Sequence, residues 1–358
     1  MGEVLANRII TSFVHGYSND KHSLSGNSLP CLAVFEDGKS KINDFENPRN
    51  ISEFRNCSMP IMGEPPLQSA KDFDTLPRFG MTGLTLAKDH VFAGGWNGVY
   101  KLDKTTLKCE GFVTHRLMND LHGITYYDGK LITILTGKDT VVLTDDHGDI
   151  LEYYTIHADL SIVKNDEKLM EYDWRFLSKQ FRGATGIFHF NYVQIIDDEI
   201  WLTARNLGCF IVLNLKTQTC ELRTINQKTT VLLHDGAIHD GFFYFTSIDG
   251  KIIIASNKEE TNPREKIDDI SLFNRDLSSR IIRIADTGLG YEPNWCRGID
   301  VKDEKIVCTI DGFYGTDLAF KVAEFENETF KRLHRVSWSD IGDVAGLKFV
   351  TGFDVKFL

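Results

Sequence analysis

The stretch HGITYYDGKLITIL, at residues 122–135, recurs along the chain in recognisable form. Each copy has a head residue, an alternating strand, an acidic or glycine turn about six residues further on, and a second strand. Such a pattern is typical of a β-hairpin with a tight turn, because Asp-Gly readily adopts positive φ. The other complete copies are residues 82–95 (TGLTLAKDHVFAGG), 191–204 (NYVQIIDDEIWLTA), 234–247 (HDGAIHDGFFYFTS) and 297–310 (RGIDVKDEKIVCTI).

Most copies continue into two further strands. After residue 135 these are Thr140–Thr144 and Ile150–Ile156, and after residue 204 they are Cys209–Leu215 and Thr219–Ile225. Four antiparallel strands repeated around an axis form the blades of a β-propeller. The repeat therefore predicts an all-β propeller in a single domain, residues 1–358.

A sixth copy starts at residue 351 and stops at residue 358 after a single strand, TGFDVKFL. Strands that would complete it occur at the other end of the chain, within residues 6–45, as Ala6–Val14, Pro30–Glu36 and Lys39–Phe45. Pairing the two ends would leave no open sheet edge in the ring. We therefore expect a six-bladed propeller closed by an inner strand at 351–358 that joins strands 6–45 in one blade.

The spacing between the copies locates three insertions. Residues 47–80 and 158–188 connect an outer strand to the next inner strand and carry apolar and aromatic residues, so we expect them to cover the channel mouth as a lid. Alternatively, they plug the channel or pack on a neighbouring subunit. Period-3.6 patterning at 165–180 favours a helix there. The charged loop 257–279 is expected on the opposite face.

Composition limits the classes of partner and compartment. A net charge of −11 argues against nucleic acid, which requires a concentrated cationic surface. Seven scattered cysteines without CxxC spacing favour reduced thiols. No signal peptide and no apolar run long enough to span a bilayer are visible, so we expect a cytoplasmic protein without a membrane partner. The oligomeric state stays open.

The head residue of each copy opens an innermost strand, so the six head side chains should ring the channel mouth. Two imidazoles, a guanidinium and an amide would then converge, a set suited to acid–base chemistry on an anionic or carbonyl-bearing substrate. We predict His122, His234 and Arg297 as catalytic residues and Asn191 as a substrate ligand. Thr82 and Thr351 complete the ring, as substrate or water contacts. The predicted ring is Thr82, His122, Asn191, His234, Arg297 and Thr351.

Four further residues are candidate substrate contacts beside the ring: Arg205, Trp295, Asp311 and Tyr314. Each has a simpler interpretation. The Asp-Gly pair at residue 311 also suits a turn, Trp295 can pack between blades, and Arg297 can pair with a nearby carboxylate.

The sequence shows neither a nucleotide-binding nor a redox-cofactor motif. We predict a small-molecule enzyme of the lyase, isomerase, cyclase or hydrolase type, working without a cofactor or with a single divalent metal. If a metal is present, His122 and His234 are its candidate ligands. The alternative is a non-catalytic propeller that binds a ligand or another protein.

Overall fold

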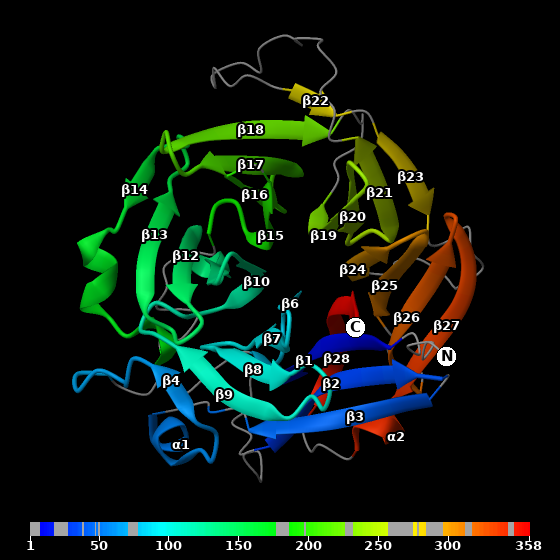
Figure 1. Ribbon diagram of the computed structural model, residues 1–358, viewed down its shortest axis with the longest axis horizontal. Helices are drawn as coiled ribbons and strands as arrows, with labels where there is room; N and C mark the ends of the chain where they lie inside the picture. The colour runs from blue at the N-terminus through cyan, green and yellow to red at the C-terminus, as the bar shows by residue number, and fades with distance from the viewer. Residues whose placement is uncertain are drawn as a thin grey trace.

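The fold is seen in a computed structural model of the chain (Figure 1). It describes residues 8–17, 28–37, 39–46, 48, 51–70, 78–176, 186–196, 198–225, 232–256, 275–277, 279–283, 296–311, 317–342 and 347–358. Six sheets, each built on four antiparallel strands, stand around a central axis as the blades of a β-propeller (Figure 1). The predicted six-bladed fold is confirmed.

The first three blades follow one another along the chain. Blade one contains β6 (Leu84–Leu86), β7 (His90–Gly94), β8 (Val99–Asp103) and β9 (Cys109–Thr114). Blade two contains β10 (Leu121–Tyr127), β11 (Lys130–Leu135), β12 (Thr140–Asp145) and β13 (Ile150–Ile156). Blade three contains β15 (Phe190–Ile196), β16 (Glu199–Ala204), β17 (Cys209–Asn214) and β18 (Thr219–Ile225).

The remaining three blades complete the ring, and the sixth unites the two ends of the described chain. Blade four contains β19 (Leu233–His239), β20 (Phe242–Ser247), β21 (Lys251–Ser256) and β23 (Ser279–Arg283). Blade five contains β24 (Cys296–Lys302), β25 (Lys305–Asp311), β26 (Leu318–Glu326) and β27 (Thr329–Ser337). Blade six contains β28 (Leu347–Phe357), β1 (Ile9–Tyr17), β2 (Ser28–Glu36) and β3 (Lys39–Glu46).

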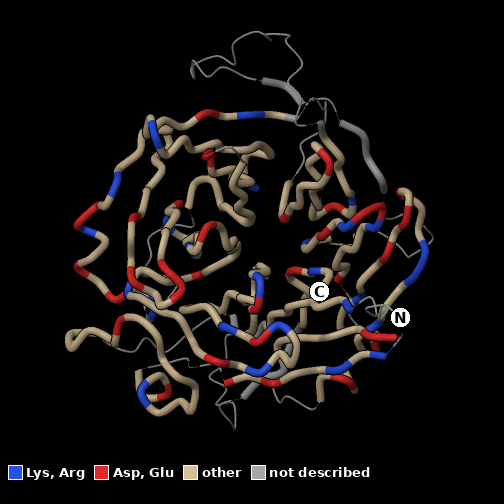
Figure 2. The backbone as a smooth tube through the Cα atoms, viewed as in Figure 1, with Lys and Arg blue, Asp and Glu red and all other residues tan. Residues whose placement is uncertain are grey.

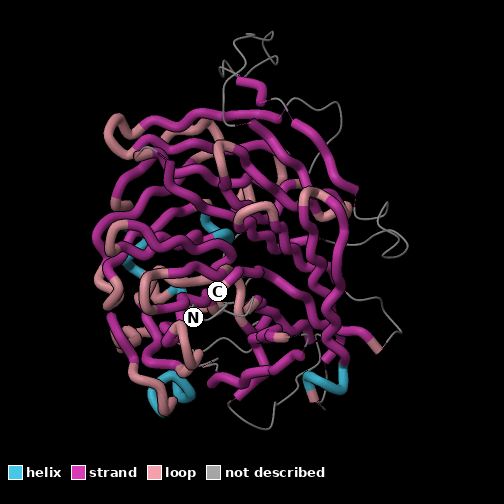
Figure 3. The backbone as a smooth tube through the Cα atoms, turned by 45° about the vertical axis from the view of Figure 1, so that its right-hand side comes forward, coloured by secondary structure: helices cyan, strands magenta, loops and turns pink. Residues whose placement is uncertain are grey.

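Short elements decorate the sheets (Figure 3). Four extra strands extend them: β4 (Ile61–Gly63) on β9, β5 (Arg78–Gly80) on β1, β14 (Ile162–Lys164) on β13 and β22 (Arg275–Leu277) on β18. The helical elements are α1 (Ile51–Asn56), α2 (Trp338–Ile341) and the 3₁₀ turns η1 (Thr136–Lys138), η2 (Glu167–Glu171) and η3 (Trp174–Phe176). No helix in the described ranges has the length and apolarity to cross a bilayer.

Blade six begins its C-terminal strand earlier than the sequence suggests. β28 starts at Leu347 rather than residue 351, because its first residues continue the ladder with β1 up to the pair Tyr17–Leu347. At the other end, Leu358 N donates to Arg8 O at 2.9 Å. The last strand of the chain therefore lies beside the first over its whole length.

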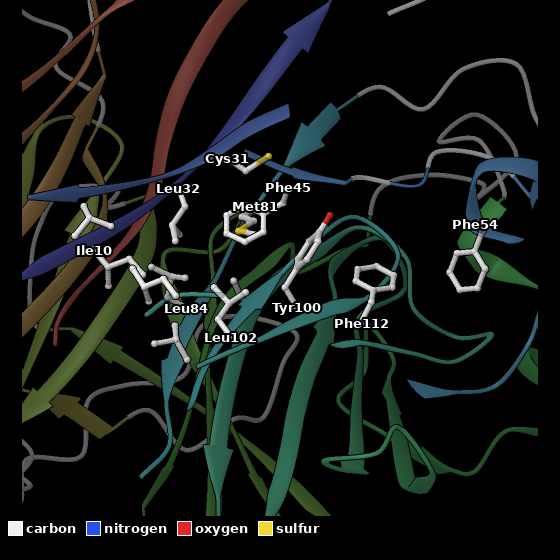
Figure 4. Packing of buried hydrophobic residues seen from close by; sticks show 14 of the residues in the cluster. Ile10, Cys31, Leu32, Phe45, Phe54, Met81, Leu84, Tyr100, Leu102 and Phe112 are labelled. Carbon is white, nitrogen blue, oxygen red and sulfur yellow. The ribbon is translucent and has the colours of Figure 1, made fainter. Parts of the chain in front are cut away.

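Buried apolar side chains form six clusters, one between each pair of neighbouring blades in the described chain. Figure 4 shows the cluster between blades six and one, where Ile10 and Leu32 face Leu84, Leu102 and Tyr100. Because both faces of each sheet are buried, blade strands alternate between two cores rather than between core and solvent.

The two predicted lid segments contact each other. The buried guanidinium of Arg175 pairs with Asp173 through Nη2–Oδ2 at 2.7 Å and donates from Nη1 to Glu64 O at 2.6 Å. Asp173 in turn accepts from Leu67 N at 3.0 Å. In the described part of the first segment, α1 and β4 lie at the outer rim of blade one (Figure 1). A lid role stays a prediction, since residues 71–77 and 177–185 lie outside the described chain.

Two other sequence expectations meet the structure only in part. The helix expected at 165–180 is replaced, as far as it is described, by η2 and η3, with Asp166 capping η2 through Lys168 N. The chain becomes extended at Tyr172, and the next residue, Asp173, turns inward to meet Arg175. Most of the charged loop 257–279 lies outside the described residues.

Candidate functional site at the channel mouth

A repeated β-bulge places the head residues. In blades two to five the inner strand has one residue more than its partner at the same point, for example between the pairs Leu121–Leu135 and Ile124–Thr133. A bulge redirects the side chain that it contains. The residues at the start of these four bulges are His122, Asn191, His234 and Arg297, which are four of the predicted ring residues.

The close packing of inner strands fixes the same geometry. A Cβ on Gly123 would meet Asn191 O at 2.7 Å, and a Cβ on Gly298 would meet Asp354 Cα at 2.4 Å. At these two positions, only glycine permits the neighbouring inner strand to approach so closely.

The ring position in blade six belongs to Phe353, and the expectation of Thr351 is wrong. The bulge in β28 lies between Gly352 and Val355, two residues later than the sequence alignment implies. Asp354 confirms the shift, because it accepts from Leu84 N of the next blade. Asp235, which follows His234, accepts from Ile299 N of its next blade in the same way. The ring therefore contains one large apolar side chain.

Phe353 lies between the two ring histidines. Its ring centroid is 5.3 Å from that of His122 and 5.3 Å from that of His234, with edge-to-face geometry in both pairs. The two imidazoles are thus within twice that distance of each other, although they come from β10 and β19. The structure brings them into one environment.

His122 lies between two oxygen acceptors. Its Nδ1 is 2.6 Å from Asn191 Oδ1, and its Nε2 is 3.4 Å from Asp120 Oδ1. Because the amide oxygen only accepts, the proton of the neutral ring lies on Nδ1. Nε2 is then the nitrogen that can take up a proton, and the carboxylate of Asp120 would stabilise the resulting charge.

His234 is arranged differently. Its Nε2 is 3.3 Å from Arg297 Nη1, and since a guanidinium only donates, Nε2 accepts and the ring proton lies on Nδ1. Burial and the positive charge of Arg297 hold the pKa of His234 well below its usual value, with smaller effects from His122, Arg205 and His189. His234 is therefore a neutral hydrogen-bond donor.

Arg297 is held from its other side by Asp311, with 3.7 Å between Nε and Oδ2. Burial raises the pKa of Asp311 to about 6, while the charge of Arg297 and hydrogen bonds from Thr351 and Arg297 act in the opposite direction. Thr351 thus reaches the site through Asp311 rather than as a ring residue. The pairing of Arg297 with Asp311, foreseen as the simpler interpretation, is present.

Arg205 joins the site through a histidine. Its Nη1 is 3.4 Å from His189 Nε2, and the His189 ring lies 5.2 Å from that of His122, edge to face. The segment that carries His189 is held by the buried carboxylate of Asp139, which accepts from the backbone N–H groups of Phe188 and His189 at 3.2 and 3.3 Å.

The cavity at the ring is small. Thr82, Asp120, His122 and Phe353 line a cavity of about 10 Å³ together with Val14, Gly80 and Trp96. This is the room of a single water molecule. A larger ligand would therefore lie on the outer side of the ring.

Below the ring, the inner strands of all six blades enclose a second cavity of about 140 Å³. Its charged lining residues are Asp235, Asp300, Asp354 and Lys356. Lys356 Nζ is 3.0 Å from Asp354 Oδ1, and although burial opposes the shift, the nearby carboxylates of Asp354, Asp300 and Asp235 raise the pKa of Lys356 above its usual value. This cavity has no lining residue in common with the cavity at the ring.

Two predicted contacts, Trp295 and Tyr314, lie outside the described residues. The structure brings together His122, Asn191, His234 and Arg297, with Thr82, Arg205, Asp311 and Thr351 around them. In the described chain, no group of three or more His, Cys, Asp or Glu side chains is arranged to hold a metal ion.

Phe353 and Asp139 are among the site residues that sequence reasoning missed. Phe353 could not be predicted because the bulge in blade six lies two residues later than the repeat alignment implies. Its one signal was a phenylalanine in an inner strand where other copies have smaller residues. Asp139 carries no signal in the local sequence, because its backbone contacts are with a segment about fifty residues away.

Comparison with known proteins supports the fold and goes no further. No protein-family model matches the sequence, and no curated protein matches it. A chain in the crystal structure of a nidogen/laminin complex is similar over 98% of this chain and 97% of its own, with a TM-score of 0.54 and 5% identity. The β-propeller domain of Cps50 (Swd1) from Myceliophteria thermophila aligns with 71% of this chain and 85% of its own, with a TM-score of 0.43 and 10% identity. At such identities the likeness concerns the fold alone.

Proposed function

We propose that the protein is a small-molecule enzyme whose active site is the channel mouth. One observation carries the proposal: two histidines, an asparagine and an arginine from four different blades meet around Phe353. Packing alone would be satisfied by apolar residues there, because burying polar groups is costly unless they are paired.

The geometry supports distinct roles for the ring residues. His122 would take a proton at Nε2, and Asp120 would stabilise the imidazolium. His234 would donate from Nδ1 to an oxygen that gains negative charge. Arg297, held by Asp311, would bind an anionic or carbonyl group.

These roles suit a lyase, an isomerase or cyclase, or a hydrolase. Such chemistry can proceed without a cofactor or with a single divalent metal, for which His122 and His234 are the candidate ligands. Neither a nucleotide nor a redox cofactor is part of the proposal.

We also infer a cytoplasmic protein with a small-molecule partner rather than nucleic acid or a membrane. All seven cysteines lie in described residues and none of them forms a disulfide, as expected in a reducing compartment. In the described chain, Lys and Arg lie interspersed with Asp and Glu around the blades in Figure 2.

The test is turnover of a small-molecule pool by purified protein, followed by mass spectrometry. We expect wild type to consume at least one compound, and His122→Gln to lower that rate by roughly 10²–10⁴-fold, the usual contribution of a general acid or base. The matched control is His147→Gln, at a histidine whose side chain is 71% exposed.

Equal rates for wild type and His122→Gln, with unchanged melting temperature, would contradict catalysis at this site. The second candidate, a non-catalytic ligand-binding or protein-interaction propeller, would instead retain a ligand at the mouth or a partner protein without converting any compound.

A further inference from the structure

Two buried hydrogen-bond donors at the mouth have no acceptor among the described residues. They are Asn191 Nδ2 and His234 Nδ1, and both residues are only 2% exposed. Their other polar atoms are engaged, Asn191 Oδ1 with His122 and His234 Nε2 with Arg297. A buried donor without an acceptor is rare in folded proteins, so the pair points to an acceptor that comes from a ligand.

These donors lie in a region of balanced charge. Arg297 contacts His234 and Arg205 contacts His189, which places two guanidinium groups near the site. Asp120 beside His122 and Asp311 beside Arg297 provide two carboxylates. A group with two negative charges would be repelled by both acids, whereas a singly charged group can bind between them.

We propose that the mouth binds a small monocarboxylate, whose oxygens accept hydrogen bonds from Asn191 Nδ2 and His234 Nδ1. A carboxylate offers two acceptor oxygens in one plane and also matches the planar guanidinium of Arg297. Phe353, between His122 and His234, provides an apolar surface beside these polar groups. The inference rests on the proposed function in placing the ligand at the same ring, and it adds the class of compound.

The test uses nuclear magnetic resonance of protein labelled with ¹⁵N-histidine, with the His234 signals assigned from His234→Gln. The probes are sodium acetate and sodium glycolate. Sodium chloride, sodium phosphate and acetamide serve as comparisons for ionic strength, double charge and the neutral shape. We expect the His234 Nδ1 resonance to shift saturably with acetate or glycolate, in the millimolar range typical of so small a ligand.

Asn191→Asp tests the donor role with almost no change in shape. The new carboxylate still accepts from His122 Nδ1, so the fold is kept, but the donor is replaced by a charged acceptor. We expect affinity for acetate to fall by at least tenfold. Asn327→Asp, which adds the same charge in the turn between β26 and β27, should leave it unchanged.

Several results would overturn the inference: no shift with either carboxylate, an equal shift with acetamide or chloride, tighter binding of phosphate, or full acetate affinity in Asn191→Asp. Failure here is distinct from failure of the proposed function. If turnover depends on His122 but no carboxylate binds, only this inference is contradicted. If a carboxylate binds but no compound is converted, only the proposal of catalysis is contradicted.

Discussion

Asp139 is a buried carboxyl group whose charged form is disfavoured in the folded protein. Burial raises its pKa from 3.8 to about 6, even though the backbone N–H groups of Phe188, Ile187 and His189 oppose the shift. The folded protein thus keeps a proton on Asp139 at pH values where the unfolded chain has lost it. Between about pH 4 and pH 6 this residue makes the unfolding free energy fall as pH rises.

We expect Asp139→Asn to flatten that dependence. Asparagine keeps an oxygen acceptor for the segment 186–189 but does not titrate, so the part of the pH dependence due to residue 139, on the order of 3 kcal/mol, should disappear. Urea unfolding of wild type and Asp139→Asn from pH 4 to pH 7 measures this pH dependence of the unfolding free energy. An unchanged slope would show that the carboxyl is not buried, and Asp128→Asn, in an exposed turn, is the control.

The two inserted segments, residues 47–80 and 158–188, are joined through the buried side chain of Arg175. The side chains of Arg175 and Asp173 are both 0% exposed, and the guanidinium also lies over the rings of Phe54 and Phe176. Arg175→Met would leave a buried carboxylate without its counter-charge. We expect a loss of about 3–5 kcal/mol in unfolding free energy, measured by chemical denaturation.

Arg332→Met is the matched control for this substitution. Arg332 pairs with Glu324 at 3.8 Å, but its side chain is 58% exposed. An exposed pair contributes at most about 1 kcal/mol, so this variant should be nearly as stable as wild type. Equal losses in the two variants would mean that the inserted segments are not joined through Arg175.

The hairpins at the heads of the copies could be predicted from sequence because each depends on local alternation and turn residues. Four of the six ring residues followed from that alignment. The fifth, Thr82, was placed beside the same cavity. Thr351 failed because the position of a bulge depends on pairing with β1, which lies over three hundred residues away in the chain. The helix at 165–180 failed because a long-range contact, that of Arg175 with Glu64, overrode local periodicity.

At the scale of the whole molecule, the arrangement of blade six makes a prediction about chain connectivity. Since Leu358 N bonds to Arg8 O, a short linker from residue 358 to residue 8 should be tolerated. A circular permutant opened in the exposed turn between β10 and β11 should fold with a melting temperature close to wild type. Deleting residues 347–358 should abolish cooperative unfolding, because blade six loses its inner strand. A permutant that cannot fold, or a deletion that folds normally, would contradict the pairing.

The proposed site requires side chains from different blades to meet at the channel mouth, and the pKa of His234 tests this directly. Arg297 lies 63 residues from His234 in sequence, and its charge lowers the pKa of that imidazole. In protein labelled with ¹⁵N-histidine, we expect Arg297→Met to raise the pKa of His234 toward its usual value. An unchanged pKa would show that the two residues lie in separate environments and would contradict the site.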